Sequence, residues 1–393
     1  MPRTPALLAA LLLLSAGCIG GPATGGETTT APTTTTTTTA SGAGTSTVAP
    51  DALPPGVTGD GLNESALLAA HAETLARRGA TVRSNYTVEG AGVDRYDDLR
   101  VTERATVGPN ATRLSVRGEI VMDGNRTASA KFANRSLVLM RNARGDEARY
   151  YGRELPAGER DPTRGLAASA VQRRRLADLL RGGNFSVTAA EGDRVTLVAT
   201  TFADGEETRY ADRRVRLVVD GDGVVRSLVA NGTLADGGAF RYEYRVDALG
   251  ATTVATPAWV ASAPEIVHPR LDVGFENCTS PYLRVANRGG DVLPAGTTLT
   301  LTTGGETYRI AFESALAPDE TRYVYRADGQ VRVASEAPDP ATVDGFGHEA
   351  EVNVATAEGF HVLSGGFAFQ CATASEDGDG GSSGGGESAS AGG

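Results

Sequence analysis

This 393-residue sequence has only four histidines and three cysteines but 48 acidic residues, and their spacing matches no catalytic or metal-binding motif. The four histidines are His71, His268, His348 and His361, and they form neither an HExxH nor an HxH pair, so zinc has no binding motif. No GxSxG nucleophile elbow and no Walker loop is present. We therefore predict no metal, no cofactor and no enzyme, although two acids far apart in the sequence would escape such a search.

Two polar motifs are better explained by a structural role than by metal binding or catalysis. The run Asp220-Gly221-Asp222-Gly223 suggests calcium, but it lacks the spaced carboxylates of an EF-hand loop, so a hairpin turn is the favoured interpretation. His71 shares a helical spacing with Leu67, Leu68 and Leu75. A histidine on such an apolar stripe is predicted to lie in the protein core.

The N-terminus carries a pattern typical of export. Arg3 precedes an apolar run of nine residues, Ala6 to Leu14, which is too short to span a hydrocarbon core of about 30 Å as a helix. Ser15-Ala16-Gly17-Cys18 follows, and small residues before a cysteine resemble the lipobox of prokaryotic lipoproteins. The resemblance implies a signal peptide over residues 1–17 and a lipid on Cys18 that anchors the chain to the membrane. An ordinary signal peptide with a chance cysteine is the alternative.

Low-complexity sequence flanks the rest of the chain. Residues 18–60 form a linker in which ten of the twelve residues from Thr28 to Thr39 are Thr, a composition with no apolar surface to bury. This linker is either an O-glycosylated stalk or a bare spacer, and in both cases it lifts the folded part off the membrane. Residues 373–393 are predicted to be a disordered tail rich in Gly, Ser and acidic residues.

Glycosylation sequons are far more frequent than their composition predicts. Eight of the eleven asparagines begin an N-x-Ser/Thr sequon, where chance would give about two. We expect several of them to carry glycans at the surface, although some of these asparagines are also typical turn residues. The eight are Asn63, Asn85, Asn110, Asn125, Asn134, Asn184, Asn231 and Asn277.

Residues 61–262 combine helical and strand patterns. Asn63 is placed to cap a helix that Gly79 ends. Period-two alternation follows, most clearly over Phe240–Val246, where aromatic and charged residues take opposite faces. A second helix is predicted from the apolar spacing over residues 166–180. The apolar face of such a sheet must be shielded from water by other elements. We therefore expect an antiparallel half-barrel covered by helices.

The end of this domain resembles a known fold. The segment from Arg216 to Leu228, the Phe/Tyr-rich strand after it and Pro257-Ala258-Trp259 are similar to the LolA/LppX-like lipoprotein-carrier fold, as in haloarchaeal lipoproteins of unknown function. Characterised relatives hold acyl chains between the half-barrel and its helices, which implies a lipid or other hydrophobic ligand. The alternative is that the protein's own core side chains fill the space against the apolar face, so that no ligand binds there. Arg173-Arg174-Arg175 and Arg181 could meet anionic headgroups or form a solvated helix face.

Residues 263–372 contain short strand-like runs separated by Gly, Pro and Asp turns, at the spacing of a β-sandwich. The run from Leu283 to Leu299 is similar to the Ig-like repeats of archaeal and bacterial surface proteins. Cys278 and Cys371 lie near the two ends of this domain, and an exported protein keeps its disulfides. We predict a bond between them, which closes a loop of about 90 residues and contributes roughly 4–5 kcal/mol in the chain-entropy model. Two buried free thiols are the alternative.

The charge composition excludes one class of partner and indicates a habitat. The net charge is −11, and Lys131 is the only lysine among 37 basic residues. A net negative surface excludes a nucleic-acid binder that works by neutralising phosphates. Arginine in place of lysine, together with excess carboxylate, fits the hydrated surface of a protein from a halophilic archaeon.

These patterns together predict a mainly-β (α+β) protein, in which an antiparallel half-barrel sheet covered by helices is followed by an Ig-like β-sandwich. The predicted function is that of a non-catalytic glycoprotein at the extracellular face of the cell membrane, held there by lipidated Cys18 and binding a lipid or other hydrophobic ligand. A structural or adhesive envelope glycoprotein without a ligand is the second hypothesis. An enzyme of unrecognised type is the third.

Overall fold

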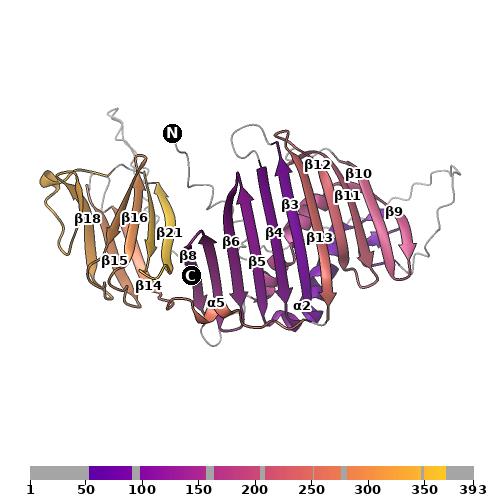
Figure 1. Cartoon of the computed structure of the whole chain (residues 1–393), viewed down its shortest axis with the longest axis horizontal. Coiled ribbons are helices and arrows are strands. Elements are labelled where there is room, and N and C mark those ends of the chain that lie inside the picture. Colours follow the sequence, from indigo (N-terminus) through magenta and orange to yellow (C-terminus); the bar gives the residue numbers. More distant parts are fainter. Residues whose placement is uncertain are drawn as a thin grey trace, which may run out of the picture. The chain divides into compact units, whose positions relative to one another are not determined.

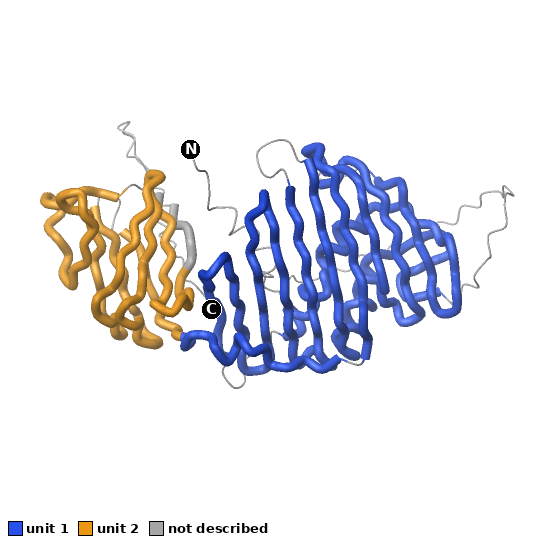
Figure 2. The backbone as a smooth tube through the Cα atoms, viewed as in Figure 1, with its two compact units in different colours: residues 1–266 blue, residues 267–393 orange. Residues whose placement is uncertain are grey.

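The computed structural model describes residues 53–90, 98–155, 163–203, 209–250, 252–275, 281–346 and 349–368. Two compact units make up the chain, unit 1 over residues 1–266 and unit 2 over residues 267–393 (Figure 2). The expected signal peptide, most of the Thr-rich linker and the C-terminal tail fall outside the described residues, as do Cys18, Asn277, Cys278 and Cys371. Among the described helices, none is long and apolar enough to cross a membrane.

An antiparallel sheet of eleven strands forms most of unit 1 (Figure 1). Its spatial order is β8-β7-β6-β5-β4-β3-β13-β12-β11-β10-β9, and pairing of β3 with β13 joins its N-terminal and C-terminal halves. The sheet is not closed into a barrel, since β8 and β9 are its two edges. The strands are β3 (Ala80–Glu89), β4 (Asp98–Val107), β5 (Leu114–Met122), β6 (Asn125–Ala133), β7 (Leu137–Arg144), β8 (Glu147–Glu154), β9 (Gly183–Glu191), β10 (Arg194–Phe202), β11 (Tyr210–Asp220), β12 (Val225–Leu234) and β13 (Ala239–Leu249).

The two faces of this sheet differ as the sequence alternation predicts. On β13, Phe240, Tyr242 and Tyr244 are buried, whereas Arg241 and Arg245 are exposed. We call the face with the buried residues the inner face and the other the outer face. Ion pairs lie on the outer face, for example between Arg241 and Glu243 at 2.6 Å.

Three helices lie against the inner face: α2 (Glu64–Arg78), α3 (Thr163–Ala170) and α4 (Arg173–Leu180) (Figure 1). Leu67 and Leu75 of α2 and Leu176 and Leu179 of α4 are fully buried, and they share one core cluster with inward side chains of the sheet. This burial stabilises the packing of the helices on the sheet, because burying one leucine contributes about 1.5–3 kcal/mol.

The predicted start and end of α2 are confirmed. The Asn63 side-chain oxygen accepts the Ala66 amide at 3.0 Å, which satisfies one of the free donors in the first turn. Gly79 adopts a φ of 79°, which favours glycine, and its amide donates to the Leu75 carbonyl at 2.9 Å. Sequence chemistry therefore fixes both ends of this helix.

The single helix expected over residues 166–180 is wrong in one respect, because the chain forms two helices there. Gln172, which lies between α3 and α4, adopts a left-handed backbone with a φ of 61° that interrupts the helical path. A non-glycine residue in this region is strained, and such strain persists only where surrounding contacts hold it. Gln172 donates a side-chain hydrogen bond to Glu103 of β4, and this bond is one such contact.

Short elements complete unit 1. They are β1 (Val57–Thr58), β2 (Gly61–Leu62), the 3-10 turn η2 (Pro109–Ala111) and α5 (Ala258–Ala261). The segment that leads to α5 is tied to the sheet, since the Arg113 guanidinium donates to the Thr256 hydroxyl at 2.9 Å.

Unit 2 is built from two four-stranded antiparallel sheets, with orders β14-β15-β18-β19 and β17-β16-β20-β21. Leu283 and Val285 from the first sheet and Leu299 and Val352 from the second are fully buried in one shared core. The strands are β14 (Pro269–Phe275), β15 (Leu283–Gly290), β16 (Thr298–Thr303), β17 (Glu306–Ala311), β18 (Thr321–Ala327), β19 (Gln330–Ala334), β20 (Glu349–Ala355) and β21 (His361–Ala368), with the 3-10 turn η3 at Pro340–Thr342.

The expected mainly-β class is therefore confirmed. Antiparallel sheets dominate both units, and helices cover one face of the larger sheet. Assignment of unit 2 to the Ig-like class stays a prediction.

Candidate functional site

The helices leave part of the inner face of unit 1 uncovered. α3 packs over β4 and β5, and inward side chains of β3 and β10–β13 are buried in one core cluster with the helices, whereas most inward side chains of β6, β7 and β8 are half-buried or exposed. Cross-strand register identifies the inward side chains, because Leu114 and Ala133 face each other within the core and every second residue from them points the same way. We name the inward residues of these strands beyond Leu114 and Ala133 the β5–β8 patch; they are Val116, Gly118, Ile120, Met122, Asn125, Thr127, Ser129, Lys131, Val138, Met140, Asn142, Arg144, Glu147, Arg149, Tyr151 and Arg153.

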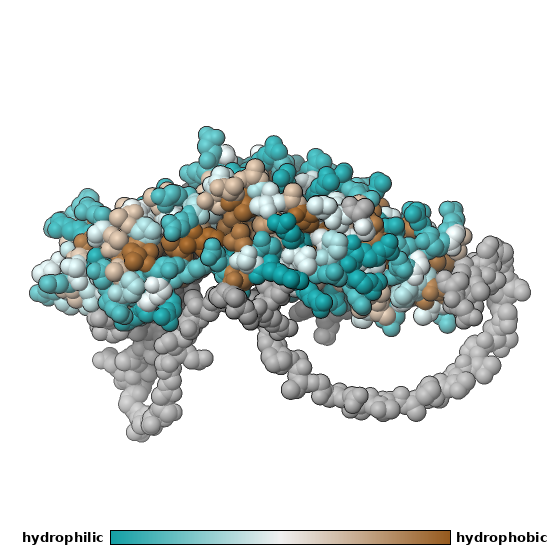
Figure 3. Space-filling view, turned by 90° about the horizontal axis from the view of Figure 1, so that it is seen from below, coloured by the Kyte–Doolittle hydropathy of each residue, from teal (hydrophilic) through white to brown (hydrophobic). Residues whose placement is uncertain are grey.

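Apolar side chains of this patch are only partly shielded. Ile120, Met122 and Met140 are half-buried and lie outside the core cluster, although Val116 and Val138 pack against it. Seen from below, the surface of the molecule shows apolar residues between polar ones (Figure 3). Met122 and Met140 are the only methionines besides Met1. Methionine is flexible and polarisable, and it adapts to apolar partners of varied shape.

A cluster of polar side chains lies at the border between the covered and uncovered parts. Glu103 of β4 points inward between Val101 and Ala105, and the Gln172 side-chain amide donates to its carboxylate. Lys131 of β6 lies two strands away on the same face, with its charge close enough to influence Glu103. Gln172 thus connects the break between α3 and α4 to this acid.

Burial shifts the pKa values of both charged groups in this cluster. Burial raises the pKa of Glu103, an effect that the Gln172 hydrogen bond and the charges of Lys131 and Arg175 oppose. Burial also lowers the pKa of Lys131, and the charge of Glu103 opposes this shift. Both shifts have the sign that desolvation produces. Polar groups held in a partly dry setting are suited to bind the polar end of a ligand.

Gly118 of β5 allows close packing of the side chains around the cluster. It lies between Glu103 on β4 and Ser129 on β6 in the cross-strand register. A Cβ atom at this position would approach the Ser129 hydroxyl to 2.9 Å, closer than side chains normally pack. The absence of a side chain therefore lets Ser129 lie close against the β5 backbone beside Glu103.

Arginines of α4 divide between solvent and the interior. Arg173, Arg174 and Arg181 are exposed, as a solvated helix face requires. Arg175 is instead half-buried, and its guanidinium lies 4.5 Å from the centre of the Tyr86 ring. The expectation of a fully solvated run is therefore wrong at Arg175, where a cation–π contact with an inner-face tyrosine stabilises the buried charge.

The two motifs that the sequence attributes to the fold are both structural. His71 is fully buried; the Val225 amide donates to its Nδ1 at 3.2 Å, and its Nε2 lies 2.9 Å from the Tyr244 hydroxyl. Desolvation lowers its pKa from 6.5 to about 3. The Asp220 side chain accepts the Val224 amide at 2.9 Å, which closes the hairpin turn between β11 and β12. Among the described residues, no group of three or more His, Cys, Asp or Glu is arranged to hold a metal.

Seven of the eight sequon asparagines are among the described residues. Three of them lie on the outer face of the sheet: Asn85, Asn184 and Asn231. Three others lie at or beside turns: Asn110, Asn125 and Asn134. The seventh, Asn63, caps α2. Asn85 and Asn134 are half-buried and the other five are exposed. Whether any of them carries a glycan stays a prediction.

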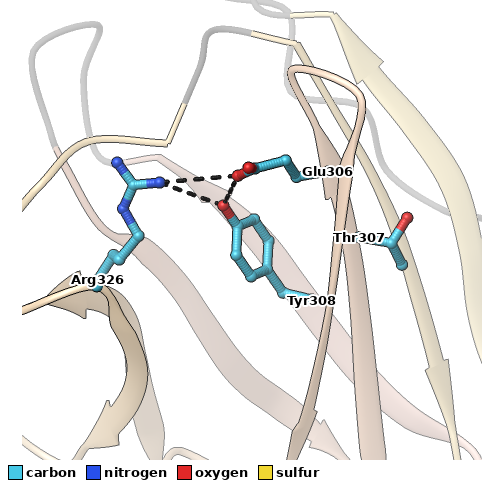
Figure 4. Close-up of a pocket in the computed structure, with 5 residues that line it drawn as sticks. Glu306, Thr307, Tyr308 and Arg326 are labelled. Carbon is cyan, nitrogen blue, oxygen red and sulfur yellow. Dashed lines mark hydrogen bonds and ion pairs between the residues drawn. The ribbon is translucent and has the colours of Figure 1, made fainter.

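A recess lies on unit 2, lined by Glu306, Thr307, Tyr308, Arg326 and Gly329, with a volume of about 470 Å³ (Figure 4). Its charged and polar groups are bonded to one another: the Tyr308 hydroxyl donates to Glu306, and Arg326 donates to the Tyr308 oxygen at 3.2 Å. Arg326 also lies 3.9 Å from Glu306. Because these groups satisfy each other, the β5–β8 patch is the better candidate site.

Sequence reasoning missed the cluster around Glu103, although a signal was present. The inward positions of β4 are Leu99, Val101, Glu103, Ala105 and Val107, so one acid interrupts an otherwise apolar alternation. The single lysine of the chain was a second signal. What the sequence could not show is that Gln172, far along the chain, meets this acid.

Comparison with known proteins gives no family. No family model and no curated protein matches the chain. The crystal structure of LprF from Mycobacterium bovis is similar over 49% of this chain and 96% of its own, with 12% identity and a TM-score of 0.28. A DUF1329 family protein from Desulfovibrio piger is similar over 50% of this chain and 95% of its own, with 10% identity and a TM-score of 0.18. Both TM-scores are too low to establish a shared fold.

Proposed function

We propose that this chain is a non-catalytic, lipid-anchored glycoprotein of the cell surface, and that unit 1 binds a lipid or other hydrophobic ligand on the β5–β8 patch. The observation that carries the proposal is the uneven burial of the inner face: inward side chains of β3 and β10–β13 are buried in one core cluster with the helices, whereas most of those on β5–β8 are not. Half-buried Ile120, Met122 and Met140 remain beyond the core cluster.

The physical basis of binding is the hydrophobic effect. Apolar surface gains about 25 cal/mol for each Å² removed from water, and a chain laid over these residues would remove both its own surface and theirs. The patch residues lie on hydrogen-bonded strands, and a site whose backbone is already ordered loses less entropy on binding. Attachment through Cys18 would keep this surface close to the membrane that supplies the ligand.

The experiment is native mass spectrometry of the protein purified from its producing cells and exchanged into volatile buffer. The wild-type chain should retain a lipid-sized mass. Ile120→Glu places a charge on the patch and should abolish most of that retention. Val121→Glu is the matched control, because Val121 is the next residue of β5 and points to the outer face. A wild-type protein that carries no ligand would overturn the proposal.

The second candidate function is a structural or adhesive envelope component without a ligand. It is favoured by the filled interior of the covered part, where Leu67, Leu176 and Leu179 have no exposed surface. The same experiment separates the two functions, because this one requires ligand-free protein in every variant.

A further inference from the structure

A row of arginines crosses the outer face of the large sheet. Arg117 on β5, Arg104 on β4, Arg83 on β3 and Arg245 on β13 lie directly opposite one another in the cross-strand register of four adjacent strands. All four residues are exposed, and we name them the arginine row. Neighbouring strands lie about 4.8 Å apart, so the row aligns four cations along about 14 Å.

The register continues from this row to both edges of the sheet without meeting an acid. The positions that continue it are Tyr150, Arg141 and Ala130 on one side and Ser227, Val218, Thr196 and Ala189 on the other. The chain as a whole has a net charge of −11. Like charges directly opposite each other destabilise a sheet, so the stability of the fold gives no reason for this alignment.

One acid beside the row neutralises part of its charge. Asp247 of β13 pairs with Arg83 at 2.5 Å and with Arg245 at 3.3 Å. Arg104 and Arg117 form no hydrogen bond or ion pair with any residue that the structure describes. The row therefore holds four guanidinium groups against one carboxylate.

The positive charge is confined to a narrow stripe. On one side of the row, the next outward positions of β5 and β13 are Glu119 and Glu243, and these acids pair with arginines outside the row. On the other side, the next outward positions of β4 and β5 are Thr106 and Ser115, which are half-buried and lie opposite each other. A ligand along the stripe would meet cations in a line with hydroxyl groups beside them.

We propose that the arginine row binds a linear acidic polysaccharide, a chain of sugars that each carry a carboxylate. The planar guanidinium group matches the geometry of a carboxylate and forms strong, charge-assisted hydrogen bonds with it. One sugar ring is about as long as the spacing between two strands, so carboxylates along an extended chain can meet arginines along the row. The hydroxyls of Thr106 and Ser115 lie beside the row, where they can bond to the sugar hydroxyls.

This inference goes beyond the proposed function, because the row lies on the face opposite the β5–β8 patch and requires no bound lipid. The shape of the stripe favours a single chain over a flat anionic membrane. A membrane laid on this face would also meet Glu119 and Glu243, whose charges repel anionic headgroups. A linear polymer can follow the row and avoid both acids.

The test is calorimetric titration of the full-length protein with tetragalacturonate, its methyl ester and monomeric galacturonate. The solution contains the lowest salt concentration at which circular dichroism shows the folded protein, because salt screens exposed ion pairs. Tetragalacturonate should bind at least about tenfold more tightly than the monomer, since one bound carboxylate raises the effective concentration of the next. The methyl ester has the same rings without charge and should show no such gain.

The decisive variant combines Arg104→Gln with Arg117→Gln, which removes the two unpaired cations. It should bind tetragalacturonate at least about fivefold more weakly, a factor that one exposed ion pair can supply. It should also fold, because it relieves repulsion between like charges. The matched control combines Arg214→Gln with Arg216→Gln, at exposed positions on the outer face of β11, and should change binding by less than about twofold.

Each contrary result identifies the step that is wrong. Absence of tetragalacturonate binding, or equal losses in the two double variants, would overturn the site. Equally tight binding of the methyl ester would overturn the role of charge. Equally tight binding of pentathymidylate, which carries four phosphates, would overturn the choice of a polysaccharide. Binding of Cys18→Ser protein to anionic vesicles but not to tetragalacturonate would overturn it in favour of a membrane surface.

Discussion

His71 gives the sharpest prediction about stability, because unit 1 holds it neutral in its core. It is fully buried between the Val225 amide and the Tyr244 hydroxyl, and its pKa falls from 6.5 to about 3. In the unfolded chain the imidazole regains its ordinary pKa and binds a proton below pH 6.5. Acid therefore favours the unfolded state at this residue.

The magnitude follows from linkage between protonation and folding. The His71 contribution is fully present above pH 6.5 and falls by about 1.4 kcal/mol per pH unit as the pH drops toward 3. Between pH 7 and pH 5 the expected loss is about 2 kcal/mol, a large share of the roughly 5–15 kcal/mol that typically stabilises a folded protein.

The assay compares chemical denaturation of the wild-type protein with that of His71→Gln, whose amide can take both hydrogen bonds but does not titrate. Trp259 is the only tryptophan and belongs to unit 1, so its fluorescence follows that unit. The stability difference between wild type and variant should shift by about 2 kcal/mol from pH 7 to pH 5. His268→Gln is the matched histidine replacement in unit 2, at an exposed position, and should leave the unfolding of unit 1 unchanged. A His71→Gln difference that is the same at both pH values would refute the reasoning.

Three further predictions follow. Arg175→Met removes the cation–π contact and should lower the free energy of unfolding of unit 1 by about 1 kcal/mol, whereas exposed Arg174→Met should change it little; equal losses in denaturation midpoints would contradict the contact. Cys18→Ser should release the protein into the medium, and membrane retention in fractionated cells would argue against the anchor. Non-reducing peptide mapping should recover Cys278 and Cys371 in one linked peptide pair, and free thiols at both positions would rule the disulfide out.

Local sequence signals predicted the elements of the fold well where one chemical rule governs them. Asn63 and Gly79 mark the ends of α2 as capping chemistry requires, and the alternation over Phe240–Val246 gives the inner and outer faces of β13. Residues 166–180 were less predictable. Their apolar spacing continues through the left-handed Gln172, and the contact that accompanies the break comes from Glu103 on a distant strand.

The candidate site was harder to predict than the fold for the same reason. The alternation of apolar and polar residues shows that a strand has one apolar face. It does not show how many strands of the sheet the helices cover. Lys131, Met122 and Met140 are rare residue types in this chain, yet only the β5–β7 register brings them onto one face. Arg175 looks like its exposed neighbour Arg174 in sequence, and only the position of Tyr86 on β3 distinguishes them.

The central claim, that the β5–β8 patch receives the apolar part of a ligand, is tested most directly by methyl NMR of methionine-labelled protein. Besides Met1, the labelled methyl groups are those of Met122 and Met140, and both lie on the patch. Both resonances should shift in a saturable way when dodecyl maltoside is added. If the ligand binds while both methyl resonances stay unchanged, the ligand lies elsewhere and the claim is contradicted.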